Sequence, residues 1–139
     1  MKRFVISEIE IGQKASITQE ITEGNILIFA GATGDLNPVH INEDFAEKTK
    51  FTTRIAHGML SVSLIAAVLG RKLPGEGSVY VSQDVKFKAP VFIGDIITAE
   101  VEVIAKDIER NRITLNTTCM NQSGQIVIEG QAVSMPIKQ

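Results

Sequence analysis

The chain has 139 residues, of which 44% are hydrophobic and 22% are charged, and its formal net charge at pH 7 is −2. This composition is ordinary for a folded protein, and the length fits a single domain with a sizeable core, which we expect to span residues 1–139. Acidic and basic residues are scattered along the chain. Without a basic block or stripe, the chain is not expected to bind nucleic acid.

The apolar segments are too short for export or membrane insertion. Residues 4–6 form a much shorter apolar run than a signal peptide needs. Residues 55–69 are interrupted by polar residues and glycine, and they fall short of the ~20 residues that span a bilayer. Cys119 is the only cysteine, so no internal disulfide can form. We therefore expect a cytoplasmic protein with no membrane partner.

The first part of the chain predicts a strand, a helix and an irregular segment, in that order. Residues 14–21 alternate weakly between apolar and polar side chains, as a strand does. Thr22 suits the N-cap of a helix whose apolar positions continue until Gly31 and Gly34 interrupt them. Residues 31–56 have little apolar periodicity. They predict an overhanging loop that contains one short helix, capped by Asn42.

The rest of the chain predicts a long helix and then several strands. The segment that begins at residue 57 is apolar around almost the whole helical circumference, so this helix should be buried on most sides. Strand patterns follow, separated by turn-like segments, at residues 79–88, 97–103, 113–119 and 126–135. These elements predict an α+β fold in which a curved antiparallel sheet wraps around one long central helix. Such a sheet leaves an open edge and face, and we expect a second copy, in a homodimer, to cover them.

The sequence GDLNPVH, residues 34–40, contains the first candidate site. Neither a strand nor a helix would bring together Asp35 and His40, which are five positions apart. Pro38 forces the chain to bend, however, and Asn37 can brace the bend by bonding to the local backbone. A converging carboxylate and imidazole could transfer protons near neutral pH. The alternative is a surface turn with a solvent-facing His40.

No metal ion and no bound cofactor are expected. The D-x-N sequence is similar to the start of a calcium loop, but Val39, His40 and Ala46 occupy positions where such a loop needs a ligand, a glycine and a glutamate. One histidine and one carboxylate are too few ligands for a zinc site. The glycines near residue 34 have neither the lysine of a phosphate-binding loop nor the spacing of a dinucleotide fingerprint. Ser61 and Ser63 have no nucleophile-elbow sequence around them.

The second histidine, His57, precedes Gly58 at the predicted start of the long helix. The simpler interpretation of His57 is a residue near the helix cap that bonds to local backbone. A glycine at a helix N-terminus exposes a backbone N–H at the positive end of the helix dipole. The Gly58 N–H is therefore a ready donor for an oxygen that gains negative charge during a reaction.

Together these residues resemble the R-specific enoyl-CoA hydratases of the MaoC-like, hot-dog-fold group. The resemblance rests on FAGATGDLNPVHINEDFA (residues 29–46), IAHGML (residues 55–60) and the strand region of residues 78–103, and it covers nearly the whole chain. It implies a hot-dog fold, a homodimer, and the reversible syn hydration of trans-2-enoyl-CoA to (R)-3-hydroxyacyl-CoA. It implies no cofactor beyond the CoA of the substrate. Some relatives have a serine where this chain has Ala66, so no acyl-chain length is implied.

By this resemblance, Asp35 and His40 would be the catalytic pair. The ordinary pKa of an imidazole, about 6.5, suits His40 as the general base toward water, and Asp35 can orient that water. Either residue can deliver the proton to Cα. The Gly58 N–H would hold the thioester carbonyl, and Asn37, Pro38 and His57 would support the motif. Two alternatives remain open. One is a hot-dog thioesterase, in which the water attacks the thioester carbonyl, and the other is a non-catalytic module that binds acyl-CoA.

Overall fold

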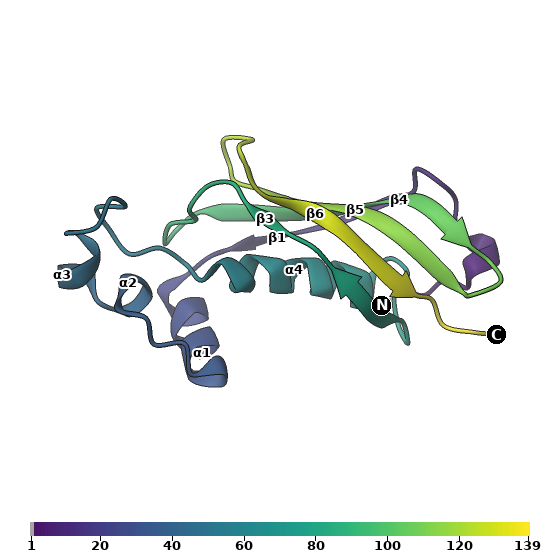
Figure 1. The fold of residues 1–139 in the computed structure, drawn as a ribbon, viewed down its shortest axis with the longest axis horizontal. Coiled ribbons are helices and arrows are strands. Elements are labelled where there is room, and N and C mark those ends of the chain that lie inside the picture. The colour runs from purple at the N-terminus through teal and green to yellow at the C-terminus, as the bar shows by residue number, and fades with distance from the viewer. Residues whose placement is uncertain (1) are drawn as a thin grey trace.

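The computed structural model describes residues 2–139 and contains a six-stranded antiparallel sheet that curves around one long helix (Figure 1). The strands are β1 (Lys14–Glu20), β2 (Val79–Gln83), β3 (Lys86–Phe87), β4 (Ile96–Asp107), β5 (Arg112–Met120) and β6 (Ile126–Met135). Their order in the sheet is β1-β4-β5-β6-β2, and β3 also pairs with β6. This architecture confirms the predicted α+β hot-dog fold.

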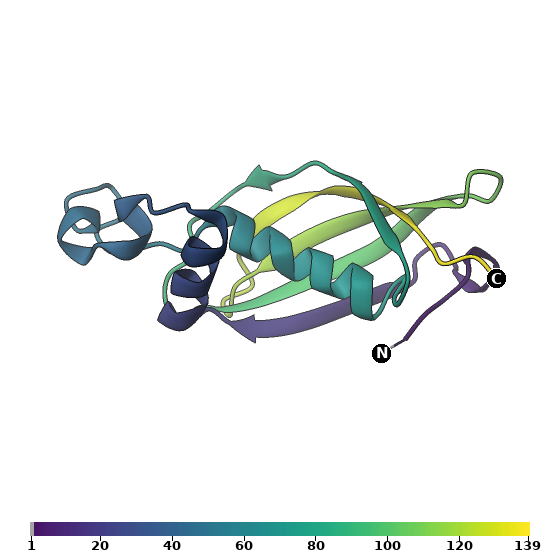
Figure 2. The ribbon, with the colours of Figure 1, turned by 90° about the horizontal axis from the view of Figure 1, so that it is seen from below.

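The helices are a short 3-10 helix (Ile6–Glu8), α1 (Glu23–Thr33), α2 (Pro38–Ile41), α3 (Glu43–Ala46) and α4 (Gly58–Arg71). Figure 2 shows α4 lying across the concave face of the sheet, while α1, α2 and α3 gather beyond the end of the sheet where α4 begins. Between residues 2 and 139, no helix is long and apolar enough to cross a membrane.

The core lies between one side of α4 and the inner face of the sheet. The buried positions of α4 recur at helical spacing, and they are Ser61, Val62, Ile65, Val68 and Leu69. The inner residues of β4 and β5 alternate as predicted, and each is fully buried: Ile97, Ala99, Val101, Val103, Ile113, Leu115, Thr117 and Cys119. The prediction that the helix is buried on most sides is confirmed, because within α4 only Met59, Ser63, Gly70 and Arg71 are exposed. These residues form a narrow exposed stripe on the side away from the sheet, where Met59 is 53% exposed.

The strand expected at residues 79–88 is divided into β2 and β3, which both pair with β6. The chain between them crosses very close to β6, since a Cβ on Gly130 would lie only 1.9 Å from the carbonyl oxygen of Asp84. Only glycine permits such a close approach of two backbones. The division turns the short strand β3 toward the start of α4, where Phe87 contacts Gly58.

The segment before α4 is more regular than the sequence predicts. Thr22 caps α1 as expected and forms a capping box with Asn25. Gly31 does not interrupt α1, which continues to Thr33 and ends where Gly34 adopts a left-handed φ of 78°. Two one-turn helices follow, capped by Asn37 and Asn42. Residues 31–56 therefore contain two capped helical turns where the sequence predicts one short helix, and an irregular segment follows α3.

Candidate active site

Asp35 lies directly after α1, in a loop held by its own hydrogen bonds. Its backbone N–H donates to Thr33 Oγ1 at 3.1 Å, and its Oδ1 accepts the backbone N–H of Asn37 at 3.3 Å. Asp35 is exposed in the single chain. Its carboxylate is therefore oriented by the loop and accessible to a small molecule.

Asn37 and Pro38 build the turn that carries His40. Asn37 Oδ1 accepts the N–H of Val39 at 3.2 Å, and Pro38 occupies the first helical position, where a missing N–H costs nothing. The bend predicted from the sequence, with Asn37 bracing the backbone, is confirmed. The alternative of a solvent-facing His40 is wrong, because His40 is only 8% exposed.

The ring of His40 is fixed in one tautomer by a backbone carbonyl. Its Nδ1 lies 2.8 Å from the carbonyl oxygen of Ile55. Since a carbonyl oxygen can only accept, Nδ1 carries the proton and Nε2 keeps its lone pair. The pKa of His40 is lowered from 6.5, and burial is the largest cause. The nearby His57 also lowers this pKa, whereas the hydrogen bond to Ile55 and the charge of Asp35 each raise it by less than burial lowers it. The net effect favours a neutral imidazole at pH 7 with a free basic nitrogen.

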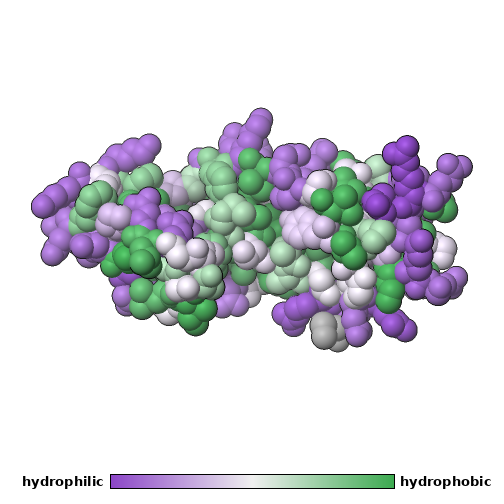
Figure 3. All heavy atoms as spheres, turned by 60° about the horizontal axis from the view of Figure 1, so that its bottom comes forward, coloured by the Kyte–Doolittle hydropathy of each residue, from purple (hydrophilic) through white to green (hydrophobic). Residues whose placement is uncertain are grey.

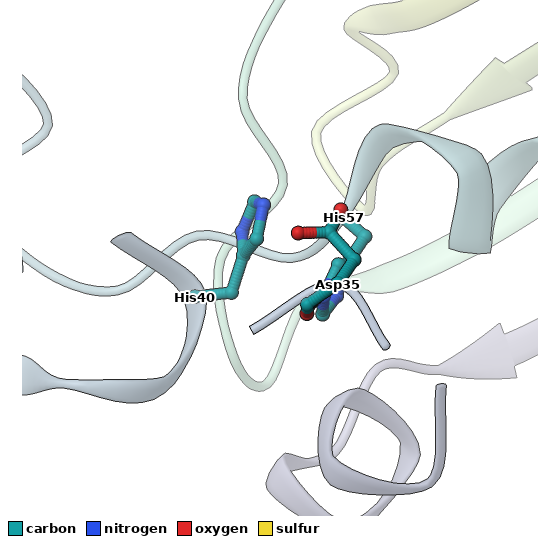
Figure 4. A group of neighbouring side chains, drawn as sticks. All are labelled: Asp35, His40 and His57. Carbon is teal, nitrogen blue, oxygen red and sulfur yellow. Dashed lines mark hydrogen bonds between the residues drawn. The ribbon is translucent and has the colours of Figure 1, made fainter. Parts of the chain in front are cut away.

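His57 supports the other side of this arrangement. Its Nε2 lies 3.0 Å from the backbone carbonyl oxygen of Asp35, and its ring stacks on that of His40 with centroids 4.0 Å apart. The ring of Phe29 packs against it at 4.9 Å. His57 is the N-cap residue of α4, as expected, but its ring does not bond to local backbone, because its partner lies 22 residues earlier and it makes no cap hydrogen bond. Figure 4 shows Asp35, His40 and His57 side by side, with the Asp35 carboxylate directed toward His40.

These three side chains each offer a ligand atom within 4.8 Å of the others, so a metal ion must be considered. A metal ion bound to two histidines lies in the plane of both rings, about 2 Å from each nitrogen. The rings of His40 and His57 are instead stacked, with an angle of 30° between their planes. One nitrogen of each ring also donates to a backbone carbonyl. The arrangement fits proton transfer better than metal coordination, and the expectation of no metal stays a prediction.

Arg54, which the sequence did not single out, holds the backbone of His40. It is 8% exposed, and its Nε donates to the His40 carbonyl oxygen at 2.7 Å, while Nη1 pairs with Glu23 Oε1 at 2.8 Å. The next residue, Ile55, donates its N–H to Val39 and accepts from the His40 ring. Residues 54 and 55 therefore fix both the main chain and the imidazole of His40.

Two cavities meet beside this group. The larger has a volume of about 340 Å³ and is lined mainly by apolar residues such as Phe51, Val91 and Ile128. The smaller, of about 210 Å³, contains the surfaces of Asp35, His40 and His57. His40, Gly58 and Phe87 border both cavities. His40 therefore lies at the junction of the two cavities, and Asp35 and His57 line the smaller one.

Gly58 is the first residue of α4 and faces this junction. A Cβ at this position would lie 2.5 Å from Cε1 of Phe87, so the ring of β3 packs directly on the glycine. Only a residue without a side chain admits that contact while its N–H remains at the helix N-terminus. The site residues proposed from the sequence are thus brought together from the loop after α1, from α2 and its cap, and from the start of α4.

A family model described as "MaoC like domain" matches residues 6–124 of the chain. The chain belongs to the MaoC-like family. This MaoC-like protein is 52% identical over 128 residues to an (R)-specific enoyl-CoA hydratase of Rhodospirillum rubrum, covering 92% of this chain and 88% of that relative. It is 45% identical over 140 residues to a 3-hydroxybutyryl-CoA dehydratase of Methylorubrum extorquens, covering 100% and 88% of the two chains.

A solved structure agrees with the sequence relationship. The unliganded R-hydratase PhaJ1 of Pseudomonas aeruginosa superimposes with a TM-score of 0.93 at 41% identity, covering 99% of this MaoC-like chain and 88% of that structure. The family assignment therefore rests on both sequence and fold.

Proposed function

We propose that this MaoC-like protein is an (R)-specific enoyl-CoA hydratase, which adds water reversibly and in syn fashion to trans-2-enoyl-CoA to give (R)-3-hydroxyacyl-CoA. The observation that carries the proposal is the buried His40, whose free Nε2 lies beside the Asp35 carboxylate at the junction of two cavities. The relatives named above, an (R)-specific enoyl-CoA hydratase and a 3-hydroxybutyryl-CoA dehydratase, support the reaction and its stereochemistry.

The pair moves one proton of a water molecule. His40 Nε2 takes this proton as the water oxygen bonds to Cβ, while Asp35 accepts a hydrogen bond from the other O–H of the water, which stays on the oxygen, and so fixes the orientation of the water. The pair then returns the proton to Cα. Because both groups act from one side of the double bond, hydrogen and hydroxyl add to the same face, and no proton is gained or lost overall. Burial of His40 supports its role as the base, since its pKa is lowered below 6.5.

The Gly58 N–H stabilises the negative charge that forms on the thioester oxygen when water attacks Cβ. It is an orphan donor in the first turn of α4, at the positive end of the helix dipole, beside the cavity junction. Removal of one such donor typically costs about 3–4 kcal/mol of transition-state stabilisation. The acyl thioester would extend into the larger cavity, where Lys50 and Lys88 offer positive charge to the CoA phosphates.

A homodimer is part of the proposal. β2 is an edge strand, and Val79 and Val81 on it are 49% and 47% exposed. A groove of about 310 Å³ separates this strand from the exposed side of α4 at Met59. Figure 3 shows hydrophobic side chains in several patches across this side of the molecule, with hydrophilic ones mainly toward its two ends. An exposed apolar edge of this kind favours pairing with a second copy.

The cytoplasmic location stays a prediction.

The test mixes the purified protein with trans-2-butenoyl-CoA and follows the ultraviolet absorbance of the enoyl thioester, with a thiol reagent in parallel. Loss of the enoyl band without release of thiol, abolished in Asp35→Asn and His40→Gln, is the expected result. Release of thiol would indicate a thioesterase. Binding without turnover would indicate a non-catalytic acyl-CoA module.

The homodimer is tested separately by sedimentation velocity at micromolar concentration. The wild-type chain is expected to sediment as a dimer, and Val81→Glu as a monomer, because the new carboxylate would be buried against the second copy. A monomeric wild-type protein would refute this part of the proposal.

A further inference from the structure

Ser61 is a buried hydroxyl without a partner beside the proposed site. The residue is 0% exposed, and its Oγ makes no hydrogen bond to any of the described residues. A buried hydroxyl that lacks a hydrogen-bond partner lowers the stability of the fold, and such groups often have a functional role. Ser61 also borders the larger cavity, together with Gly58 and His40. Its free hydroxyl therefore lies where the substrate thioester is proposed to bind.

The geometry of α4 brings Ser61 and Gly58 to the same place. Residues three apart lie on the same face of a helix, and each side chain leans toward the N-terminus over the preceding turn. The Ser61 side chain therefore projects over the first turn of α4, toward the Gly58 N–H. Both groups can donate a hydrogen bond into the cavity that they share.

Ser63 provides a contrast within the same helix. It is exposed, and its Oγ donates to the carbonyl oxygen of Met59 at 2.8 Å, which is a common bond for serine in a helix. Ser61 does not make the corresponding bond. Its backbone is held from the sheet side, because Cys119 Sγ donates to the Ser61 carbonyl oxygen at 3.5 Å. Burial raises the pKa of Cys119 to about 12, so the thiol stays protonated and can donate.

We propose that the Ser61 hydroxyl donates a second hydrogen bond, beside the Gly58 N–H, to the thioester carbonyl oxygen of the substrate. The inference rests on the proposed hydratase function and deepens it. Ser61 makes no covalent bond and keeps its proton. It supplies a donor that becomes more favourable as negative charge collects on the thioester oxygen. The Ser61 hydroxyl, which lacks a hydrogen-bond partner in the free protein, then finds one only when the substrate is bound.

The test compares Ser61→Ala with the matched control Ser63→Ala. Loss of a donor to the developing oxyanion should lower kcat/KM for trans-2-butenoyl-CoA about 10²- to 10³-fold in Ser61→Ala, mainly through kcat. The midpoint of urea unfolding should be unchanged or higher, because no hydrogen bond of the free protein is lost. Ser63→Ala should keep the wild-type rate. Ser61→Thr, which retains a hydroxyl, should recover part of the activity.

A second readout is independent of turnover. In an Asp35→Asn background, bound trans-2-butenoyl-CoA should show a thioester C=O stretch at lower frequency than in water, and adding Ser61→Ala should move it back toward higher frequency. Wild-type activity in Ser61→Ala, or an activity loss that only parallels a loss of unfolding stability, would overturn the inference. If the wild-type protein does not turn over the substrate, the proposed hydratase function is refuted, and the role of Ser61, which depends on that function, is refuted with it.

Discussion

Replacement of Arg54 by methionine should destabilise the protein far more than removal of its ionic partner. Arg54→Met keeps the buried aliphatic stem but leaves the His40 carbonyl, now 2.7 Å from Arg54 Nε, without a donor. Because His40 is only 8% exposed, that unpaired carbonyl should cost about 1–3 kcal/mol. The ion pair with Glu23 adds at most about 1 kcal/mol, since the Glu23 side chain is 59% exposed. Arg54 Nη2 is buried and has no partner among residues 2–139, so its loss removes no hydrogen bond within that range.

We therefore expect Arg54→Met to lower the free energy of unfolding by roughly 2–3 kcal/mol and Glu23→Gln by about 1 kcal/mol or less. Urea unfolding followed by circular dichroism measures both variants. Activity should fall in Arg54→Met as well, because displacement of a catalytic group by about 1 Å can cost on the order of 10²-fold in rate. Equal losses of stability in the two variants would show that the ion pair, and not the bond to His40, matters, and the reasoning would be refuted.

Three further predictions concern the site and its surroundings. Because the pKa of His40 is lowered from 6.5, its imidazole stays neutral to lower pH than a free histidine. A plot of kcat/KM for hydration against pH should therefore be flat until the pH falls below 6.5, and a decline that begins above pH 7 would contradict this. Gly58→Ala would place a Cβ 2.5 Å from the ring of Phe87, so steady-state kinetics should show an activity that is lower by about tenfold or more. The Gly58→Ala, Phe87→Ala double variant removes this clash and should recover part of the activity. Burial raises the pKa of Cys119 to about 12, so a thiol reagent at pH 8 should label this cysteine only after unfolding; rapid labelling of the native protein would contradict its burial.

The sequence alone determined the features that depend on neighbouring residues. The alternation of apolar side chains assigned the inner faces of β4 and β5, because successive residues of a strand point to opposite sides. Thr22 marked the start of α1 and Asn37 the turn before His40, because a cap bonds to backbone only two or three residues away. The local sequence GDLNPVH likewise encodes the bend between Asp35 and His40, through the bonds that Asn37 makes with Asp35 and Val39.

The contacts that tune this pair were decided only by the tertiary structure. His57 bonds to the Asp35 backbone, Arg54 to that of His40, and Phe87 packs on Gly58, although each pair is far apart in the sequence. Such contacts depend on how the elements pack, and no local pattern encodes them. Ser61 and Ser63 are the clearest case. They are the same residue type two positions apart, yet one is buried beside the cavity and the other is exposed, because only one side of α4 faces the sheet.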